Sequence, residues 1–153
     1  DLRDKSAVQN FFSKYQDISG VIHFAASKAV GESVENPLLY YENNINSLVY
    51  LLQELQKKPE AHFIFSSSCT VYGQAEKMPI TENAPIQVAM SPYGNTKQIG
   101  EEIITDVAKV TNINSIFIRY SVVEYSVDVK AYFLTCCNFT VFTNHLKSVF
   151  GLI

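Results

Sequence analysis

The segment His62-Phe63-Ile64-Phe65-Ser66 is a short apolar run that follows Pro59 and leads into a cluster of hydroxyl side chains. Its length and its aromatic and β-branched residues predict a buried strand rather than a helix. Two similar runs lie elsewhere in the chain, at residues 21–25 (VIHFA) and 115–118 (SIFI). We therefore expect three short strands of one sheet.

Segments with helical periodicity alternate with these runs. The apolar stripes that we predict are Leu38, Tyr41, Ile45, Leu48, Leu52 and Leu55 in a long central helix, and Ile99, Ile103, Val107 and Val110 in a later one. A further helix is expected over residues 5–15, and Ser91-Pro92 is a favourable start for the last helix. This alternation predicts parallel βαβ units, and therefore an α/β fold with a Rossmann-type doubly wound sheet.

The composition excludes several classes of partner. The chain is 47% hydrophobic and 18% charged, with a formal net charge of -3 and no basic block, so we expect neither nucleic acid nor a membrane surface as a partner. No apolar run is long enough to span a bilayer. The three cysteines, two of them adjacent, form no disulfide framework, which predicts a cytoplasmic protein.

Two predicted strand ends carry residues suited to binding, because ligands of open α/β sheets lie beyond the carboxyl ends of the strands. Small residues follow the strand at 21–25, where Ala26 and Ser27 would let a flat ligand approach the backbone. The hydroxyls of Ser66, Ser67 and Ser68 follow the next strand and can hydrogen-bond a substrate hydroxyl. An ordinary turn and serines that satisfy local backbone groups are the alternatives.

A third candidate is Tyr93-x-x-x-Lys97 at the start of a predicted helix. Residues four apart share a helical face, and an ammonium beside a phenol is expected to lower the phenol pKa from about 10. A tyrosine in that state can act as a general base. An exposed tyrosine and lysine are the alternative, but the position one βα unit after the serine cluster favours a catalytic pair.

These motifs together resemble the short-chain dehydrogenase/reductase superfamily, and within it the UDP-glucose 4-epimerases. The segments that carry the resemblance are residues 23–33 (HFAASKAVGES), 40–44 (YYENN), 65–73 (FSSSCTVYG) and 91–94 (SPYG). The resemblance covers residues 1–120 and implies a partial NAD-binding Rossmann domain there. Residues 121–153 do not resemble the family, and we expect an atypical tail.

The resemblance implies a reaction and residues for it. UDP-glucose and UDP-galactose are interconverted through a transient 4-keto sugar with bound NAD, in a parent protein that is a homodimer. The implied catalytic residues are Ser68, Tyr93 and Lys97, the implied substrate-binding residues are Lys28, Ser68, Thr70 and Tyr93, and no metal is expected. The implied cofactor-binding residues are Asp1, Leu2, Phe24, Ala25, Ala26, Ser27, Lys28, Asn43, Ser68, Tyr93 and Lys97.

Departures from the family keep alternatives open. The chain begins with Asp1 rather than Met and contains no Gly-x-x-Gly-x-x-Gly turn, so we expect an internal fragment that lacks activity by itself. Another nucleotide-sugar epimerase, acting on UDP-arabinose or UDP-glucuronate, is one alternative, and a non-catalytic remnant is another. A 4,6-dehydratase is disfavoured, because that branch resembles Thr-Asp-Glu where Ser68-Cys69-Thr70 stand here.

Overall fold

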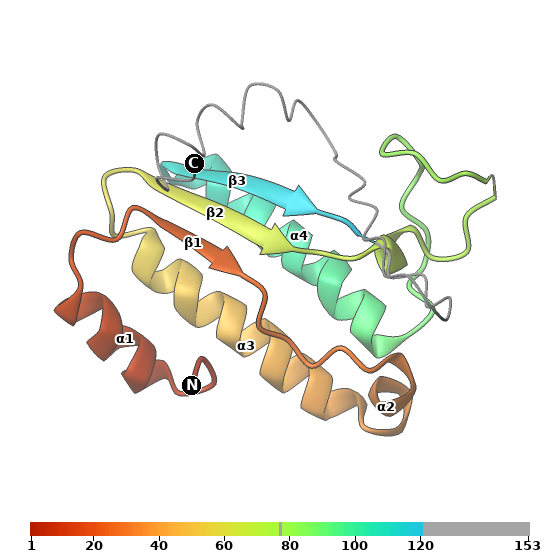
Figure 1. Ribbon diagram of the computed structural model, residues 1–153, viewed down its shortest axis with the longest axis horizontal. Coiled ribbons are helices and arrows are strands. Elements are labelled where there is room, and N and C mark those ends of the chain that lie inside the picture. Colours follow the sequence, from red (N-terminus) through yellow and green to blue (C-terminus); the bar gives the residue numbers. More distant parts are fainter. Residues whose placement is uncertain (77, 121–153) are drawn as a thin grey trace, which may run out of the picture.

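A three-stranded parallel sheet organises the chain in the computed structural model, which describes residues 1–76 and 78–120 (Figure 1). Strands β1 (Gly20–His23), β2 (Ala61–Ser66) and β3 (Ile113–Ile118) lie in the order β1-β2-β3. The register places His23 opposite Phe65 and Ser66 opposite Ile118. Because all strands run in one direction, their carboxyl ends meet at one edge of the sheet, as the predicted α/β fold requires.

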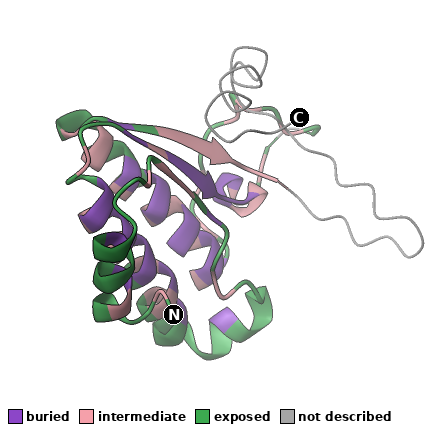
Figure 2. Ribbon diagram, turned by 60° about the vertical axis from the view of Figure 1, so that its left-hand side comes forward, coloured by how far each residue is buried: buried purple, intermediate pink, exposed green. Residues whose placement is uncertain are grey.

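One α-helix precedes the first strand, and further helices connect the strands. They are α1 (Lys5–Lys14), α2 (Val30–Glu35), α3 (Pro37–Leu55) and α4 (Pro92–Val110). Since the strand order steps in a single direction, right-handed crossovers bring α3 and α4 to the same side. The two helices pack against each other, with α1 beside α3 (Figures 1 and 2).

Capping side chains set where two of the helices begin. The Asp4 carboxylate accepts hydrogen bonds from the backbone N–H groups of Ser6 (2.8 Å) and Ala7 (3.1 Å) at the start of α1. At the start of α4, the Ser91 hydroxyl accepts from the N–H of Gly94 at 3.1 Å, and Pro92 is the first helical residue. The predicted start of this helix is confirmed.

The core lies between the sheet and the helices. Its buried side chains are Val8, Phe12, Leu48, Leu51, Leu52, Leu55, Ala61, Phe63, Phe65, Ile104 and Ile113. Helix α4 lies close to the sheet at Gly100, where an added Cβ would lie 2.8 Å from Cζ of Phe65. Glycine at this position therefore sets the distance between the helix and β2.

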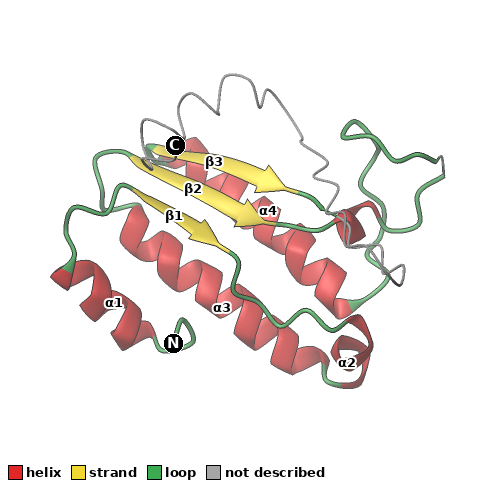
Figure 3. Cartoon of the chain, in the orientation of Figure 1, coloured by secondary structure: helices red, strands yellow, loops and turns green. Residues whose placement is uncertain are grey.

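The structure corrects several predicted details. Helix α2 and the 3-10 turn η1 (Cys69–Tyr72) were not predicted, and β1 ends before Phe24, which is exposed (Figure 3). Leu38 and Val110 are also exposed, although they belong to the predicted apolar stripes.

The predicted stripe of α4 does not form the face that this helix buries most deeply. Its buried face carries Tyr93, Lys97, Glu101 and Ile104, whereas Ile99, Ile103 and Val107 are only partly buried. Apolar periodicity cannot detect polar residues that are buried because other groups bind them. The predicted tail at residues 121–153 lies outside the described residues.

Within residues 1–76 and 78–120, no helix is both long and apolar enough to cross a membrane. The same residues contain no group of three or more His, Cys, Asp or Glu side chains that could hold a metal ion.

Two leucines of α3 test the packing directly. Leu48 is 1% exposed in the core, whereas Leu38 is 79% exposed. We expect Leu48→Ala to lower the free energy of unfolding by about 2–5 kcal/mol, because it leaves a cavity in the core. Leu38→Ala should change it by less than about 0.5 kcal/mol. Urea unfolding of both variants measures this, and equal losses would contradict the packing described.

Candidate active site

The three predicted catalytic side chains converge at the carboxyl end of β2. Ser68 caps η1, where its hydroxyl accepts a hydrogen bond from the backbone N–H of Thr70 at 3.2 Å. Tyr93 lies in the first turn of α4 and Lys97 one turn later. Ser68, Tyr93 and Lys97 are 7%, 8% and 4% exposed. Segments 25 residues apart in sequence therefore form one buried cluster.

The Tyr93 phenol does not show the lowered pKa that we predicted from the neighbouring lysine. Burial raises its pKa, the negative forms of Tyr120 and Cys69 raise it further, and a hydrogen bond with Ser68 acts in the opposite direction. Ser68 is thus the group that favours the phenolate here.

Lys97 is held by the strand rather than by the phenol. Its Nζ donates to the carbonyl oxygen of Ser66 at 2.9 Å and lies 5.8 Å from the centroid of the Tyr93 ring. It also lies 4.9 Å from the centroid of Phe65. Burial lowers the pKa of Lys97 to about 8. The ammonium is therefore confined to one position at the end of β2.

A buried histidine lies close to Lys97. His23, the last residue of β1, stacks on Phe65 with ring centroids 6.0 Å apart and an interplanar angle of 16°. Burial, and secondly the charge of Lys97, lower the pKa of His23 to about 4. The imidazole is thus neutral at physiological pH.

Two asparagines of α3 hold the loop that follows β1. The side-chain amide of Asn44 accepts from the backbone N–H of Ser27 (2.8 Å) and donates to its carbonyl oxygen (3.0 Å). The same amide donates to the hydroxyl of Thr96 at 3.1 Å, and Asn43 donates to the Ser27 hydroxyl at 2.6 Å. The predicted cofactor loop is therefore tied both to α3 and to the helix that carries Tyr93 and Lys97.

Four predicted cofactor residues line one cavity of about 360 Å³ beside β1: Asp1, Leu2, Phe24 and Ala25. The other lining residues are apolar, among them Val8, Phe12 and Val21, except for His23. The Asp1 carboxylate is engaged by Arg3 at 2.6 Å. Ala26 is partly buried and Lys28 is exposed in the following loop.

Thr70 is placed differently from the other predicted substrate contacts. Its hydroxyl oxygen is buried and has no hydrogen-bond partner among the described residues. The side chain packs against Gly94, where a Cβ would lie 3.4 Å away. Thr70 therefore helps to seat the first turn of α4 against η1.

The sequence profile of a family described as GDP-mannose 4,6 dehydratase matches residues 1–136. The chain belongs to this family.

Relatives within the family carry epimerase names. The UDP-glucose 4-epimerase of Pasteurella multocida (strain Pm70) is 41% identical over 133 residues, which cover 87% of this chain and 36% of the relative. That of Erwinia amylovora is 45% identical over 121 residues, or 78% of this chain and 36% of the relative. The resemblance to UDP-glucose 4-epimerases is confirmed.

A solved structure supports the same assignment. The UDP-glucose 4-epimerase from Bifidobacterium longum, crystallised in complex with NAD+ and UDP, superposes with a TM-score of 0.74 at 41% identity. The match covers 78% of this chain and 36% of that one. The chain thus spans about a third of the length of these relatives.

The predicted hydroxyls of Ser66 and Ser67 contact polar side chains that were not predicted from sequence, namely Tyr120 and Glu101, the latter paired with Arg119. Ser67 donates to the Glu101 carboxylate at 2.5 Å, and Arg119 donates to both oxygens of that carboxylate, at 2.9 and 2.6 Å. Ser66 donates from its hydroxyl to the Tyr120 phenol at 3.2 Å. Glu101 follows Tyr93 by eight residues and Lys97 by four, so helical spacing alone could have placed it on the same face.

The neutral state of His23 has a consequence for acid stability. Between pH 6.5 and about 4 the unfolded chain binds more protons at this position than the folded chain, so the unfolding free energy falls as the pH drops. The loss should approach about 3 kcal/mol. His23→Gln should lack it, and parallel pH curves for parent and variant in urea unfolding would contradict the buried imidazole.

Proposed function

We propose that this chain carries the catalytic side chains and part of the NAD site of a UDP-glucose 4-epimerase. The observation that supports this most directly is the convergence of buried Ser68, Tyr93 and Lys97 at the carboxyl end of β2. The epimerase names of the relatives agree with it. Substrate and cofactor are proposals, since the chain spans about a third of those proteins.

The residues around β1 fit NAD. The cavity lined by Asp1, Leu2, Phe24 and Ala25 is largely apolar, as a flat adenine ring requires. Lys28 is exposed three residues after Ala25 and would meet phosphate or ribose oxygens. Asn43 and Ser27 hold the intervening loop through their 2.6 Å hydrogen bond. Lys97 would hold the nicotinamide ribose, as the family resemblance implies.

The step proposed for the protein's own side chains is proton transfer at the sugar 4-hydroxyl. Tyr93 takes the proton of the sugar 4-hydroxyl, and the hydrogen bond from Ser68 stabilises the phenolate that must form first. Bound NAD would accept the hydride from C4 and return it. When the 4-keto sugar turns over before that return, the configuration at C4 is inverted without net oxidation.

The segment Ser68-Cys69-Thr70 supports epimerisation over dehydration. Eliminating water from a 4-keto sugar needs an acid and a base beside the reacting carbons. The family resemblance implies that dehydratases carry Thr-Asp-Glu at these positions. Here positions 69 and 70 hold a half-buried thiol and a hydroxyl packed on Gly94. Glu101, the nearby buried carboxylate, is bound by Arg119.

The remaining sequence-based expectations are proposals as well. A cytoplasmic location rests on cysteine usage, and a homodimeric parent rests on the family resemblance. We also propose that the 153-residue chain by itself is inactive, because it contains no glycine-rich turn whose N–H groups would meet a pyrophosphate.

A chimera tests the proposed activity. Residues 1–120 replace the matched segment of the Erwinia amylovora relative, which is 45% identical. The chimera should convert UDP-galactose to UDP-glucose without added reductant, whereas the 153-residue chain should show neither turnover nor micromolar NAD affinity in calorimetry. Release of a 4-keto-6-deoxy sugar would show a dehydratase instead. Conversion only of UDP-arabinose or UDP-glucuronate would select the other epimerases.

Tyr93→Phe in that chimera tests the general base. The variant keeps the ring packing but removes the proton acceptor, so turnover should fall by about 10²–10⁴-fold while NAD stays bound. Tyr15→Phe, at an exposed tyrosine of the same chain, is the matched control and should leave turnover unchanged. A Tyr93 variant within threefold of the parent would falsify the assignment.

A further inference from the structure

A buried ion pair joins four elements next to the catalytic cluster. Glu101 of α4 and Arg119, which follows β3, have side chains that are 7% and 16% exposed. Arg119 donates to both carboxylate oxygens through Nε and Nη2. Such a bidentate pair has a defined geometry that an exposed pair lacks.

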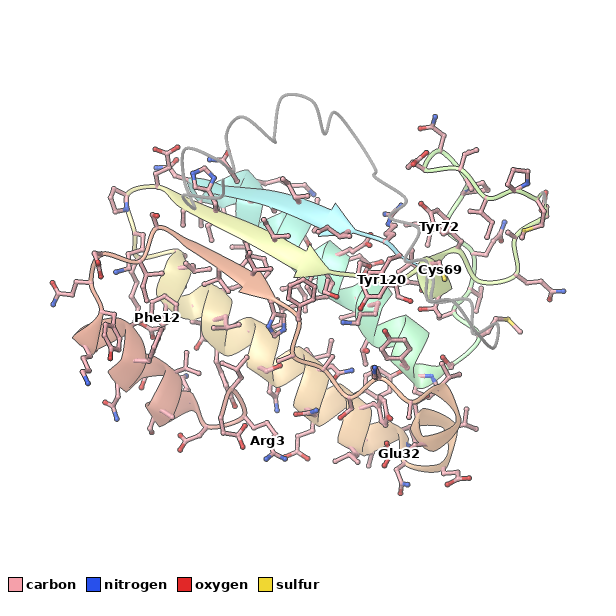
Figure 4. All side chains as sticks on the ribbon, in the orientation of Figure 1. Arg3, Phe12, Glu32, Cys69, Tyr72 and Tyr120 are labelled. Atoms are coloured by element: carbon pink, nitrogen blue, oxygen red, sulfur yellow. The ribbon has the colours of Figure 1, made fainter. Side chains whose placement is uncertain are left out.

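The remaining contacts of this pair lie on both sides of Ser68. Glu101 accepts from the hydroxyl of Ser67, the residue before Ser68. Arg119 donates through Nη1 to the Tyr72 phenol at 3.0 Å, at the far end of η1. The backbone N–H of Cys69 donates to the carbonyl oxygen of Tyr120 at 3.0 Å. In Figure 4, Cys69, Tyr72 and Tyr120 lie together beyond the ends of β2 and β3.

We propose that Glu101 and Arg119 are positioning residues, which hold η1 so that the Ser68 hydroxyl stays against Tyr93. The proposal deepens the proposed function and rests on it only for its catalytic consequence. Tyr93, Lys97 and Glu101 recur every four residues on one face of α4. One helix therefore carries the phenol of Tyr93, the ammonium of Lys97 and the carboxylate of Glu101, which binds Ser67 next to Ser68.

The ion pair is poorly explained by stability alone. Apolar residues of similar volume often replace a buried ion pair without loss of stability, whereas removal of one partner leaves an uncompensated charge. An apolar pair would not form the hydrogen bond that Glu101 accepts from Ser67 or the one that Arg119 donates to Tyr72. These two bonds hold the chain just before η1 and at its last residue.

Cys69 offers a reporter that does not depend on catalysis. With Cys136 and Cys137 changed to Ser, it is the only thiol of the 153-residue chain. We expect Glu101→Gln and Ser67→Ala to accelerate its reaction with a thiol reagent by about tenfold, because η1 opens more often. Asp106→Asn, in the exposed ion pair with Lys109 on the same helix, is the matched control and should react like the parent.

A double variant separates positioning from global stability. Glu101→Met with Arg119→Met should unfold in urea near the parent midpoint, yet Cys69 should still react about tenfold faster, because the hydrogen bond from Ser67 to Glu101 and the one from Arg119 to Tyr72 are then lost. A double variant that regains both the midpoint and the slow thiol reaction would show a purely structural pair and overturn the proposal. Unchanged thiol rates in Glu101→Gln and Ser67→Ala would also overturn it.

Turnover of the chimera tests the catalytic consequence. Glu101→Gln and Ser67→Ala should lower kcat by about 10–100-fold, since a small misplacement of a reacting group has effects of that size. The KM for UDP-galactose and NAD retention should stay within threefold of the parent. If the parent chimera is inactive, the proposed function fails while the thiol rates still decide the positioning role. An active chimera with unchanged kcat in both variants overturns the catalytic role.

Discussion

The close approach of α4 to β2 is the constraint on which the candidate site depends. Gly100 leaves space for the ring of Phe65 where any Cβ would lie 2.8 Å from it. Seven residues earlier, about 10 Å along the helix axis, Tyr93 reaches the strand end and Ser68. Lys97, between these points, is near enough to the strand to bind the Ser66 carbonyl. A bulkier residue at position 100 would displace Tyr93 and Lys97 together, because both lie on α4.

Because α4 is packed this closely, polar groups are buried between it and the sheet. Lys97 binds a backbone carbonyl, Glu101 binds Arg119 and Ser67, and His23 stays neutral beside the lysine. Low solvent exposure strengthens these interactions and makes their loss costly. A site of this kind keeps its geometry fixed, which is what proton transfer to or from a positioned phenol requires.

The two halves of the site are joined through α3 and α4. Asn44 binds the loop that follows β1 and also Thr96, which lies between Tyr93 and Lys97. The cavity beside β1 and the cluster beside β2 are therefore positioned relative to one another by side-chain hydrogen bonds as well as by strand pairing. This coupling suits a reaction in which a cofactor and a sugar must meet at one atom.

The sequence by itself determined the α/β alternation, the three strands and the start of α4 at Ser91-Pro92, because apolar period and capping residues are local signals. Four-residue spacing singled out Tyr93 and Lys97 as a candidate pair, whereas the role proposed for Ser68 came from family resemblance. It also placed Asp1 and Phe24 in one site, though only through family resemblance. Only the tertiary structure decided which face of α4 is buried, the raised pKa of Tyr93 and the hydrogen-bond partners of Asn44, Glu101 and Arg119. Those features depend on burial and on partners 18 to 52 residues away, which no local pattern records.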